Sequence, residues 1–461
     1  MIADLKPYPA YRESGLPWLG KVPKHWDVKR LKLLLREVDC RSSTGKEQLL
    51  RVSQYTGVTQ RKSMDGTDSP DSRAASLVGY KRVMPNDLVI NIMLAWNGSM
   101  GVSRYEGIAS PAYCVYRFKS GAFPWYFHEL LRIPLYKGRI KTASTGVIES
   151  RLRLYSDDLG RIEAILPPPD EQAAIVRFLN WANGQLEKAI RAKRKVITLL
   201  NEQKQVIIHR AVTRGLDPSV PLKPSGIPWL GDIPQNWETP LNQRVFREQI
   251  RPHGDLPELQ LSLSQRDGLI ATKDMQERSL QTASFDNWKV TLPGDLVLNR
   301  FKAHLGVFFA STLRGIVSFH YGVFAPRREL HAKYFELLFH TYPYRTIYAG
   351  RSNGMTVGLQ NLSNQNFYSV RCLVPPVQEQ LEIVTHIERE TKALNTAISR
   401  FEREIELLRE YRTRLVADVV TGKLDVREAA AKLPDEALID LPDNGSVEAL
   451  EDEPFEEEAL V

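Results

Sequence analysis

The chain has 461 residues, enough for two or three domains, and its 43% hydrophobic and 25% charged residues are typical of a soluble globular protein. It contains no run of 18 or more apolar residues, which argues against a membrane-spanning helix. Residues 1–11 lack the basic and apolar segments of a secretory signal.

The net charge of +7 conceals an uneven distribution. Residues 434–461 contain eleven of the 55 acidic residues and no Lys or Arg. Residues 1–433 therefore contain 62 basic and 44 acidic residues, which gives them a net charge of +18. A body this basic favours a polyanionic partner. The acidic end is predicted to be a disordered, solvating tail.

The three cysteines, Cys40, Cys114 and Cys372, are far apart and form no C-x-x-C pair. This spacing argues against a zinc ribbon and a disulfide framework, and it fits a reducing cytoplasm.

A long internal repeat is the main feature of the sequence. The segment Ser14–Gly20, followed by Pro23 and Trp26, recurs as Ser225–Gly231 with Pro234 and Trp237, and eight of thirteen positions are identical. Pro85–Asn91 returns as Pro293–Asn299, and residues 170–217 align on 378–425 with fifteen identities in 48. The unit of about 210 residues is far longer than a solenoid module, which indicates a duplicated domain.

Each repeat is predicted to have two parts. The first is β-rich, with short apolar stretches such as 87–92, 112–118, 295–298 and 321–324 between Gly, Pro, Asn and Ser. The second opens on Pro167-Pro168-Pro169 or Pro375-Pro376 and then has no proline over more than forty residues, which predicts a long helix.

The two helices carry an apolar seam at 4-3 spacing, typical of a coiled coil. The seam residues are Ile175, Leu179, Ala182, Leu186, Ala189, Val196, Leu200 and Ile207 in the first helix and Ile383, Ile387, Leu394, Ala397, Phe401, Leu408, Tyr411 and Leu415 in the second. Lys193, Gln203, Glu390 and Glu404 interrupt it. We therefore expect an α+β fold with two tandem β-rich domains, each followed by a long helix, and the two helices pairing as an antiparallel coiled coil.

Several motifs superficially suggest catalysis. Leu166–Pro169 and Val374–Val377 lack the polar residue before Pro-Pro and the aromatic residue after it that an amino-methyltransferase requires. No glycine-rich cofactor loop and no P-loop is present. Pro169-Asp170 with Glu202-Gln203-Lys204 could mimic a nuclease motif, but these residues fall on a predicted helix. The sequence therefore indicates no chemistry of its own and no metal site.

Two motifs each occur twice and in the same order over residues 12 to about 425. The first, which we call the entry motif, is S-G-[IL]-P-W-L-G-x-[IV]-P-x-x-W at Ser14–Trp26 and Ser225–Trp237, and the second is P-P-x-x-E-Q at residues 167–172 and 375–380. With both motifs in this order, the chain resembles the specificity subunits of type I restriction–modification enzymes. This resemblance implies that each β-rich domain is a target recognition domain for one half of a split, asymmetric site in double-stranded DNA. It implies helices that hold the halves apart and dock two modification subunits, with restriction subunits joining them. S-adenosylmethionine, ATP and Mg²⁺ are then expected on the partner subunits, with no cofactor in this chain.

The expected organisation has seven segments. They are an entry segment (1–26), a first recognition domain (27–169), a central helix (170–217), a second entry segment (218–237), a second recognition domain (238–377), a distal helix (378–425) and an acidic tail (426–461).

Candidate DNA-binding residues come from polar and basic loop clusters, because base edges are bound by polar side chains and phosphates by Lys and Arg. They are Gln54, Tyr55, Arg61, Lys62, Arg104 and Tyr105 in the first domain, and Gln265, Arg266, Lys273, Arg300, Lys302 and His304 in the second. The four tryptophans Trp18, Trp26, Trp229 and Trp237 are predicted to be packing residues where each domain begins.

Two other functions remain as alternatives: a self-contained DNA methyltransferase or nuclease, and a non-catalytic coiled-coil interaction protein. Methyl transfer by the chain alone would favour the first. Failure to bind DNA together with partner subunits would favour the second.

Overall fold

The computed structural model describes residues 5–61, 76–148, 151–253, 258–265, 268–275, 285, 287–354 and 361–434. The chain divides into two units, each assembled from distant parts of the sequence. Unit 1 comprises residues 1–193 and 404–461, and unit 2 comprises residues 194–403. We call the β-rich part of unit 1 the first head and the β-rich part of unit 2 the second head.

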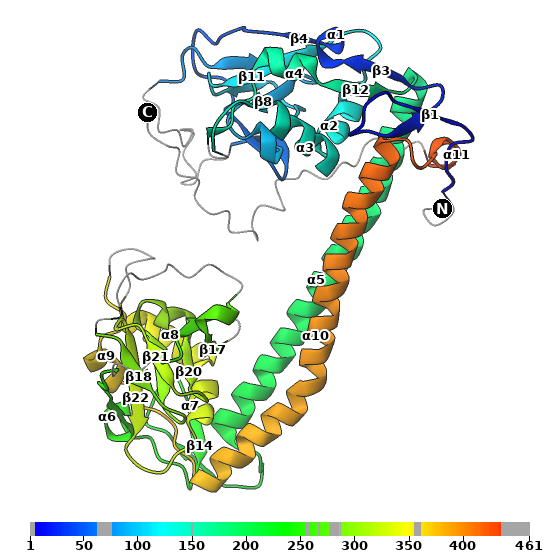
Figure 1. Cartoon of the computed structure of the whole chain (residues 1–461). Helices are drawn as coiled ribbons and strands as arrows, with labels where there is room; N and C mark the ends of the chain where they lie inside the picture. Colours follow the sequence, from blue (N-terminus) through cyan, green and yellow to red (C-terminus); the bar gives the residue numbers. More distant parts are fainter. Residues whose placement is uncertain are drawn as a thin grey trace. The chain divides into compact units, whose positions relative to one another are not determined.

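The first head is built on a four-stranded antiparallel sheet in the order β4-β11-β8-β9 (Figure 1). These strands are β4 (Leu35–Glu37), β11 (Tyr113–Phe118), β8 (Leu88–Asn91) and β9 (Met100–Val102). Four two-stranded ribbons accompany the sheet: β1 (Tyr11–Glu13) with β2 (Lys21–Pro23), β3 (Asp27–Arg30) with β12 (Glu163–Leu166), β5 (Leu50–Ser53) with β6 (Gly57–Gln60), and β7 (Lys81–Val83) with β10 (Gly107–Ala109). The helices are α1 (Leu31–Leu34), α2 (Pro124–Arg132), α3 (Pro134–Ala143) and α4 (Ser156–Arg161), with the 3-10 turn η2 (Ala95–Asn97).

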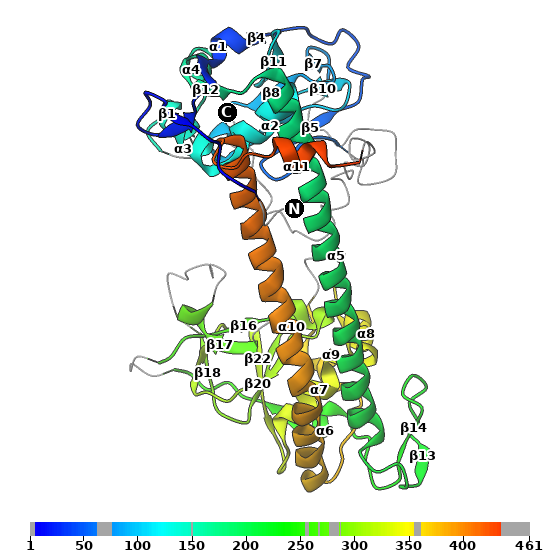
Figure 2. The ribbon, with the colours of Figure 1, turned by 90° about the vertical axis from the view of Figure 1, so that its right-hand side faces the viewer.

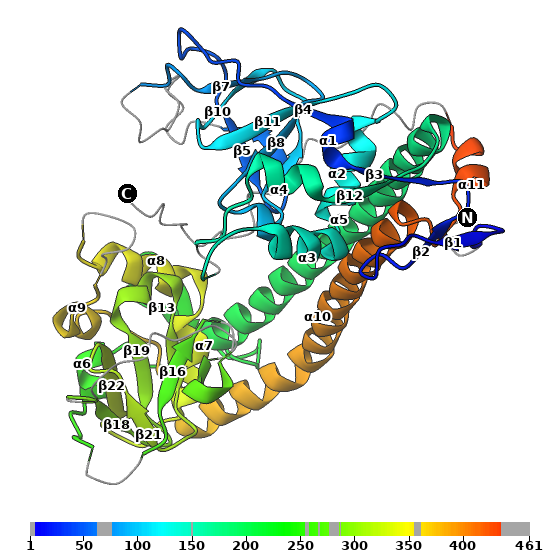
Figure 3. The same cartoon turned by 45° about the horizontal axis from the view of Figure 1, so that its top comes forward.

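The second head repeats this plan, with its sheet in the order β15-β22-β19-β20. These strands are β15 (Phe246–Glu248), β22 (Tyr321–Pro326), β19 (Leu296–Asn299) and β20 (Phe308–Ala310). Its ribbons are β13 (Leu222–Pro224) with β14 (Asp232–Pro234), β16 (Leu261–Ser264) with β17 (Gly268–Ala271), and β18 (Lys289–Thr291) with β21 (Gly315–Val317). The helices are α6 (Asn242–Val245), α7 (Ala332–Phe339), α8 (Tyr342–Arg351) and α9 (Asn364–Tyr368), with 3-10 turns η4 (Thr272–Asp274) and η5 (Arg300–Leu305). Figure 3 shows α7 beside this sheet.

Each head has its own apolar core. In the first head the fully buried Trp26, Tyr126, Tyr136 and Phe127 pack with residues from both long helices. In the second, Trp237, Tyr334, Tyr344 and Phe335 occupy the equivalent positions. Aromatic side chains bury the largest apolar area per residue, so the same few rings stabilise both copies of the fold.

Two long helices, α5 (Pro169–Arg214) and α10 (Val377–Val420), pair with each other, as Figure 2 shows. Three contacts join the helices: Glu187 with Arg412 (3.6 Å) and Lys193 with Glu404 (2.5 Å) in unit 1, and Lys204 with Asn395 (2.8 Å) in unit 2. As the residue number rises along α5, the number of the partner in α10 falls. The pairing is therefore antiparallel, and the predicted fold class is confirmed.

The predicted seam residues are buried at some positions, and neighbouring residues are buried in their place at others. Leu179 and Ile383 are fully buried, but Val196 and Tyr411 are 37% and 42% exposed. Ile190 and Ile405 are buried instead. An α-helix has 3.6 residues per turn, so a strict 3.5-residue pattern drifts around a helix over several turns.

The first residues of the segment expected to be an unstructured tail, 426–434, are folded. Residues 426–434 are described, and Arg427–Ala431 form the short helix α11. Val426 and Ala430 lie in the apolar core of unit 1. The acidic residues from Asp435 onwards lie outside the described residues.

Two of the predicted interruptions of the seam, Lys193 and Glu404, form an ion pair whose side chains are 27% and 31% exposed. Changing Lys193 to Glu places two carboxylates together, and we expect a loss of about 1 kcal/mol in the free energy of unfolding. The exchanged pair Lys193→Glu/Glu404→Lys should recover most of this loss. Urea unfolding followed by helical circular dichroism measures the effect, with Lys188→Glu on the exposed face of the same helix as control. Equal losses from the single and double variants would contradict the pairing.

Candidate nucleic-acid interface

The Glu of each P-P-x-x-E-Q motif binds the tryptophan of the entry motif in the same repeat. Glu171 accepts a hydrogen bond from the indole Nε1 of Trp26 at 2.9 Å, and Glu379 accepts one from Trp237 at 3.0 Å. Trp26 and Trp237 are fully buried. Their predicted role as packing residues is consistent with this burial, and the carboxylate explains why the two motifs occur together.

The carboxylate of Glu171 has further partners. It accepts from the hydroxyl of Tyr8 (3.2 Å), lies 2.6 Å from Nε2 of His25 and pairs with Arg427 at 3.2 Å. Burial and the neighbouring Glu171 charge raise the pKa of Tyr8. The hydrogen bond between Arg427 and Asp425 raises the pKa of Arg427. The N-terminal segment, the start of α5 and the C-terminal α11 are thus joined at one buried carboxylate.

The Gln of the same motif bonds to backbone in both repeats. The amide of Gln172 donates to Pro167 O (2.8 Å) and accepts from the Phe123 N–H (2.7 Å). Gln380 makes the equivalent bonds to Pro375 O (2.8 Å) and from the His331 N–H (2.9 Å). Each amide therefore ties the start of a long helix to the chain just before α2 or α7.

Each head also binds the end of the long helix from the other repeat. Tyr126 in α2 donates to Val420 O at the end of α10 (3.1 Å), and Tyr334 in α7 donates to Val212 O near the end of α5 (3.0 Å). Gly422, with φ of +75°, lies so close to the entry motif that a Cβ would be 2.5 Å from Pro23. Both ends of the helix pair are thereby fixed to the heads.

A repeated turn positions the central strand of each sheet. Its second residue has positive φ in both copies, 71° at Asn86 and 90° at Gly294, which explains why only Asn and Gly occur there. The buried Asp87 and Asp295 that follow accept from backbone N–H groups three residues earlier. Asp87 is paired with Arg117, and Asp295 with Arg251 from a different segment.

In the first head, the candidate residues lie in turns between strands or just after the ends of strands. Gln54 and Tyr55 form the turn between β5 and β6, and the Tyr55 side chain is 59% exposed. Arg104 is exposed and stacks over the Trp125 ring at 4.8 Å, whereas Tyr105 packs on the core cluster beneath the β5–β6 hairpin. Arg61 is exposed at the end of β6. Lys62 lies outside the described residues.

In the second head, the candidates differ in their accessibility. Gln265, Lys273 and Lys302 are exposed, whereas Arg300 points inward and pairs with Glu248 at 2.7 Å. Glu248 also receives Lys289 at 3.4 Å. Arg266 and the side chain of His304 lie outside the described residues.

Sequence comparison missed the polar residues of α2 and α7 beneath the sheets. His128 Nδ1 accepts from the Val102 N–H (3.1 Å), and in the second repeat Glu336 accepts from the equivalent Ala310 N–H (2.9 Å). Burial and the charge of Arg132 lower the pKa of His128, which keeps it neutral and able to accept. Because the residue type changes between the copies, the repeat gave no signal for this position.

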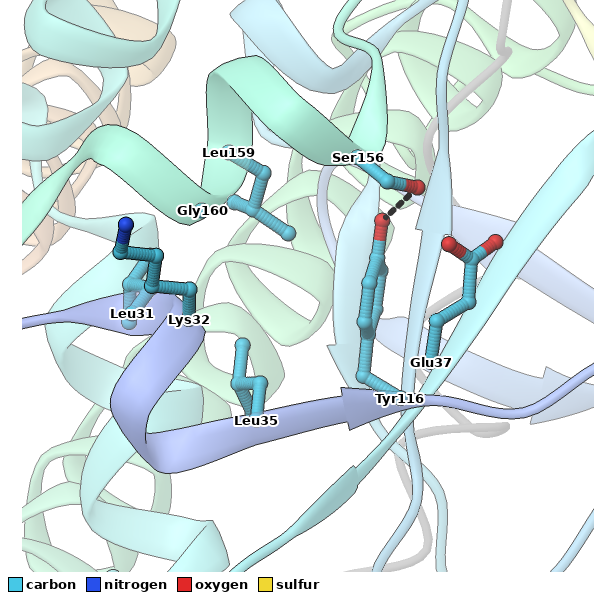
Figure 4. Close-up of a pocket in the computed structure, with 8 residues that line it drawn as sticks. All are labelled: Leu31, Lys32, Leu35, Glu37, Tyr116, Ser156, Leu159 and Gly160. Atoms are coloured by element: carbon cyan, nitrogen blue, oxygen red, sulfur yellow. Dashed lines mark hydrogen bonds between the residues drawn. The ribbon is translucent and has the colours of Figure 1, made fainter.

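One small pocket of about 130 Å³ lies between β4, β11 and α4 in the first head. Figure 4 shows the Tyr116 hydroxyl directed at Ser156 within it, and the two oxygens are 2.8 Å apart. In the second head, the bulkier Phe367 and Tyr368 take the places of Leu159 and Gly160. The pocket therefore reflects a difference in packing between the copies.

Within the described ranges, no cluster of His, Cys, Asp or Glu could hold a metal ion.

The chain is similar to known proteins over most of its length. No family model matches the chain. The chain is 22% identical over 400 residues to the EcoKI specificity subunit of Escherichia coli K12, a type I restriction enzyme, and the match covers 80% of this chain and 83% of that protein. The chain is therefore similar to a type I specificity subunit over most of its length.

Two solved structures are similar to this chain, and the one with the higher TM-score supports the shared fold. One from a study of complex assembly and conformational transition of the type I R-M system has a TM-score of 0.59 at 14% identity, covering 87% of this chain and 99% of that one. The HsdS subunit from Thermoanaerobacter tengcongensis has a TM-score of 0.42 at 16% identity, covering 87% and 98%.

The Glu171 and Glu379 hydrogen bonds predict unequal effects of the same substitution. Glu171→Gln removes a buried charge that bonds Trp26, Tyr8 and Arg427, and we expect it to destabilise unit 1 by about 2–3 kcal/mol. Among the described residues, Glu379 accepts hydrogen bonds from Trp237 and Asn236, and Glu379→Gln should cost unit 2 about 1–2 kcal/mol.

Hydrogen exchange of segments 21–30 and 232–241 measures each head separately in the full chain. Glu410→Gln, on an exposed face of α10, is the control. Loss of protection in both segments from either single variant would show that the two carboxylates do not act locally.

Proposed function

We propose that this chain is the specificity subunit of a type I restriction–modification enzyme, that it binds double-stranded DNA through both heads, and that each head recognises one half of a split, asymmetric site. The observation that carries the proposal is one scaffold built twice with identical hydrogen bonds at its base but different residues on its exposed turns. Tyr55 and Arg104 on the first head have Arg266 and Thr312 at the equivalent sequence positions of the second. Two unlike binding surfaces suit an asymmetric site better than a palindrome.

The charge of the chain supports this proposal. Residues 1–433 carry +18, and DNA-binding proteins contact phosphates chiefly with Lys and Arg. The exposed Arg61, Lys273 and Lys302 are suited to phosphates, and the exposed Gln265 is suited to base edges. We infer that Arg300, which is paired with Glu248, supports its loop from within.

The chain is proposed to act without chemistry of its own, with partner subunits supplying it. The relative is named as the specificity subunit of a type I restriction enzyme, and a similar structure comes from a study of complex assembly of such a system. By analogy, two modification subunits with S-adenosylmethionine and restriction subunits with ATP and Mg²⁺ would join this chain. The free thiols of Cys40, Cys114 and Cys372 suit work in the reducing cytoplasm.

No helix in the described part of the chain is long and apolar enough to cross a membrane. A self-contained methyltransferase or nuclease is the main alternative. Methylation by the purified chain alone, free of partner subunits, would establish that alternative.

Exchange of residues 27–165 tests whether the first head recognises its half-site independently. The ends of this segment lie on paired strands, since Asp27 pairs with Leu166 and Val28 with Ile165, so a foreign head can be inserted as a closed module. We expect the exchange to change one half of the methylated motif and leave the other half unaltered. Mapping of adenine methylation in cells that carry the partner subunits measures both halves. A change in both halves would contradict independent recognition.

A length change in the helix pair tests whether α5 and α10 set the distance between the half-sites. Leu186 and Leu394 are equivalent in the repeat, but antiparallel pairing means that they do not face each other. Seven residues inserted after Lys193 and seven before Glu404 keep the observed contacts on both sides of the insertion.

Each helix lengthens by about 10 Å, which corresponds to at most about three base pairs of unread spacer. We expect both half-site sequences to persist in the methylation motif with a longer spacer between them. The control carries the insertion in α5 alone, which cannot keep both sets of contacts. An active double insertion with an unchanged spacer would show that the helices do not set the distance.

A further inference from the structure

The Arg132 side chain makes several hydrogen bonds to the turn between β5 and β6 in the first head. Arg132, the last residue of α2, donates from Nη2 to Gln54 O at 3.0 Å and to Tyr55 O at 2.7 Å. Its Nη1 donates to Met100 O at 2.5 Å, and lies 3.3 Å from Gly98 O and 3.4 Å from Ser53 O. One guanidinium therefore connects the hairpin turn to the loop that precedes β9.

The hairpin is seated against β9 and α2 without spare room. Gly57, which begins β6 with φ of +76°, has its Cβ position 3.0 Å from Cε1 of His128 and 3.4 Å from Nη1 of Arg132. The Cβ position of Gly101 is 3.0 Å from the Cα of Gly57. These close approaches leave the turn little freedom to move while the guanidinium is in place.

A guanidinium suits this arrangement better than other side chains. It is planar, carries five N–H donors in a fixed geometry and stays protonated even where burial lowers its pKa, as burial does for Arg132. Carbonyl oxygens from the two loops converge on it. An ammonium group has three donors on a flexible stem and can satisfy only part of this set.

The second head holds the equivalent hairpin in a different way. His340 stands at the position of Arg132, and Phe309 stands at that of Gly101. The Cβ position of Gly268 lies 3.1 Å from the Phe309 ring, and His340 contacts the same ring edge-on with centroids 5.0 Å apart. His340 also hydrogen-bonds to the backbone of Phe308 and Gly306, the equivalents of Met100 and Gly98, so the second head combines aromatic packing with the bonds that an imidazole can make.

We propose that Arg132 is a positioning residue for DNA recognition by the first head, and that it fixes the Gln54–Tyr55 turn in the conformation that meets the bases. This inference rests on the proposed function. It goes beyond that function by assigning the stringency of one half-site to a residue beneath the recognition surface.

The test uses the full chain assembled with its modification subunits and measures methylation rates on duplexes that carry single-base changes in either half-site. The half-site of the first head is known from the exchange of residues 27–165. We expect Arg132→Gln to reduce discrimination in that half-site by about tenfold, which is within the usual cost of one mismatched base pair. Discrimination in the other half-site should stay unchanged. Arg132→Lys should lie between Arg132→Gln and the original chain.

Two controls separate positioning from general destabilisation. Arg161→Gln removes an exposed charge from the same head that pairs with Asp158 in its own helix. His340→Gln removes the equivalent residue of the second head, and it should leave the first half-site unchanged. If Arg132→Gln does not assemble, hydrogen exchange in Arg132→Lys tests the positioning role instead. We expect faster exchange of amides 53–58 and unchanged exchange of residues 261–265.

The outcomes are distinguishable. If the original complex methylates without discrimination at either half-site, the proposed function fails. If it discriminates normally and Arg132→Gln discriminates equally well, only the positioning role of Arg132 fails. Equal loss in both half-sites, or unchanged exchange of the turn in Arg132→Lys, would also overturn that role.

Discussion

The antiparallel pairing of α5 and α10 is the constraint on which the rest of this molecule depends. Because the helices run in opposite directions, the end of α10 lies at the start of α5, and the end of α5 lies at the start of α10. Tyr126 therefore binds Val420 O, and Tyr334 binds Val212 O. Each unit consequently combines its own β-rich part with segments from both helices.

The buried carboxylates at the helix starts complete this arrangement. Glu171 and Glu379 lie in the first turn of their helices, where the helix dipole favours negative charge. Each accepts from a buried tryptophan of the entry motif. Glu171 additionally joins the two terminal segments of the chain through Tyr8 and Arg427, which explains why α11 is ordered.

The heads differ in the interior layer that supports their exposed turns. Asp87 and Asp295 occupy the same place but are neutralised by arginines from different segments. His128 and Glu336 accept the same backbone N–H, and Arg132 and His340 occupy the same position in their respective helices. In a duplicated scaffold of this kind, the residues that hold a recognition turn can differ while the sheet stays the same. A buried backbone N–H needs a hydrogen-bond acceptor, but the acceptor can be any of several residue types.

The sequence by itself determined the duplication, the two helices and their pairing, because apolar periodicity and repeated motifs are local or directly comparable. It also indicated the packing role of Trp26 and Trp237. Only the tertiary structure decided that Arg300 pairs with Glu248, that residues 426–434 belong to unit 1, and that Arg132 supports the Gln54–Tyr55 turn. These contacts join residues up to several hundred positions apart, and in most cases the equivalent residue of the other copy is of a different type. Distance and hydrogen-bond geometry in the folded chain decide which residues become partners. The spacing of residues in the sequence predicts neither the distance nor the geometry.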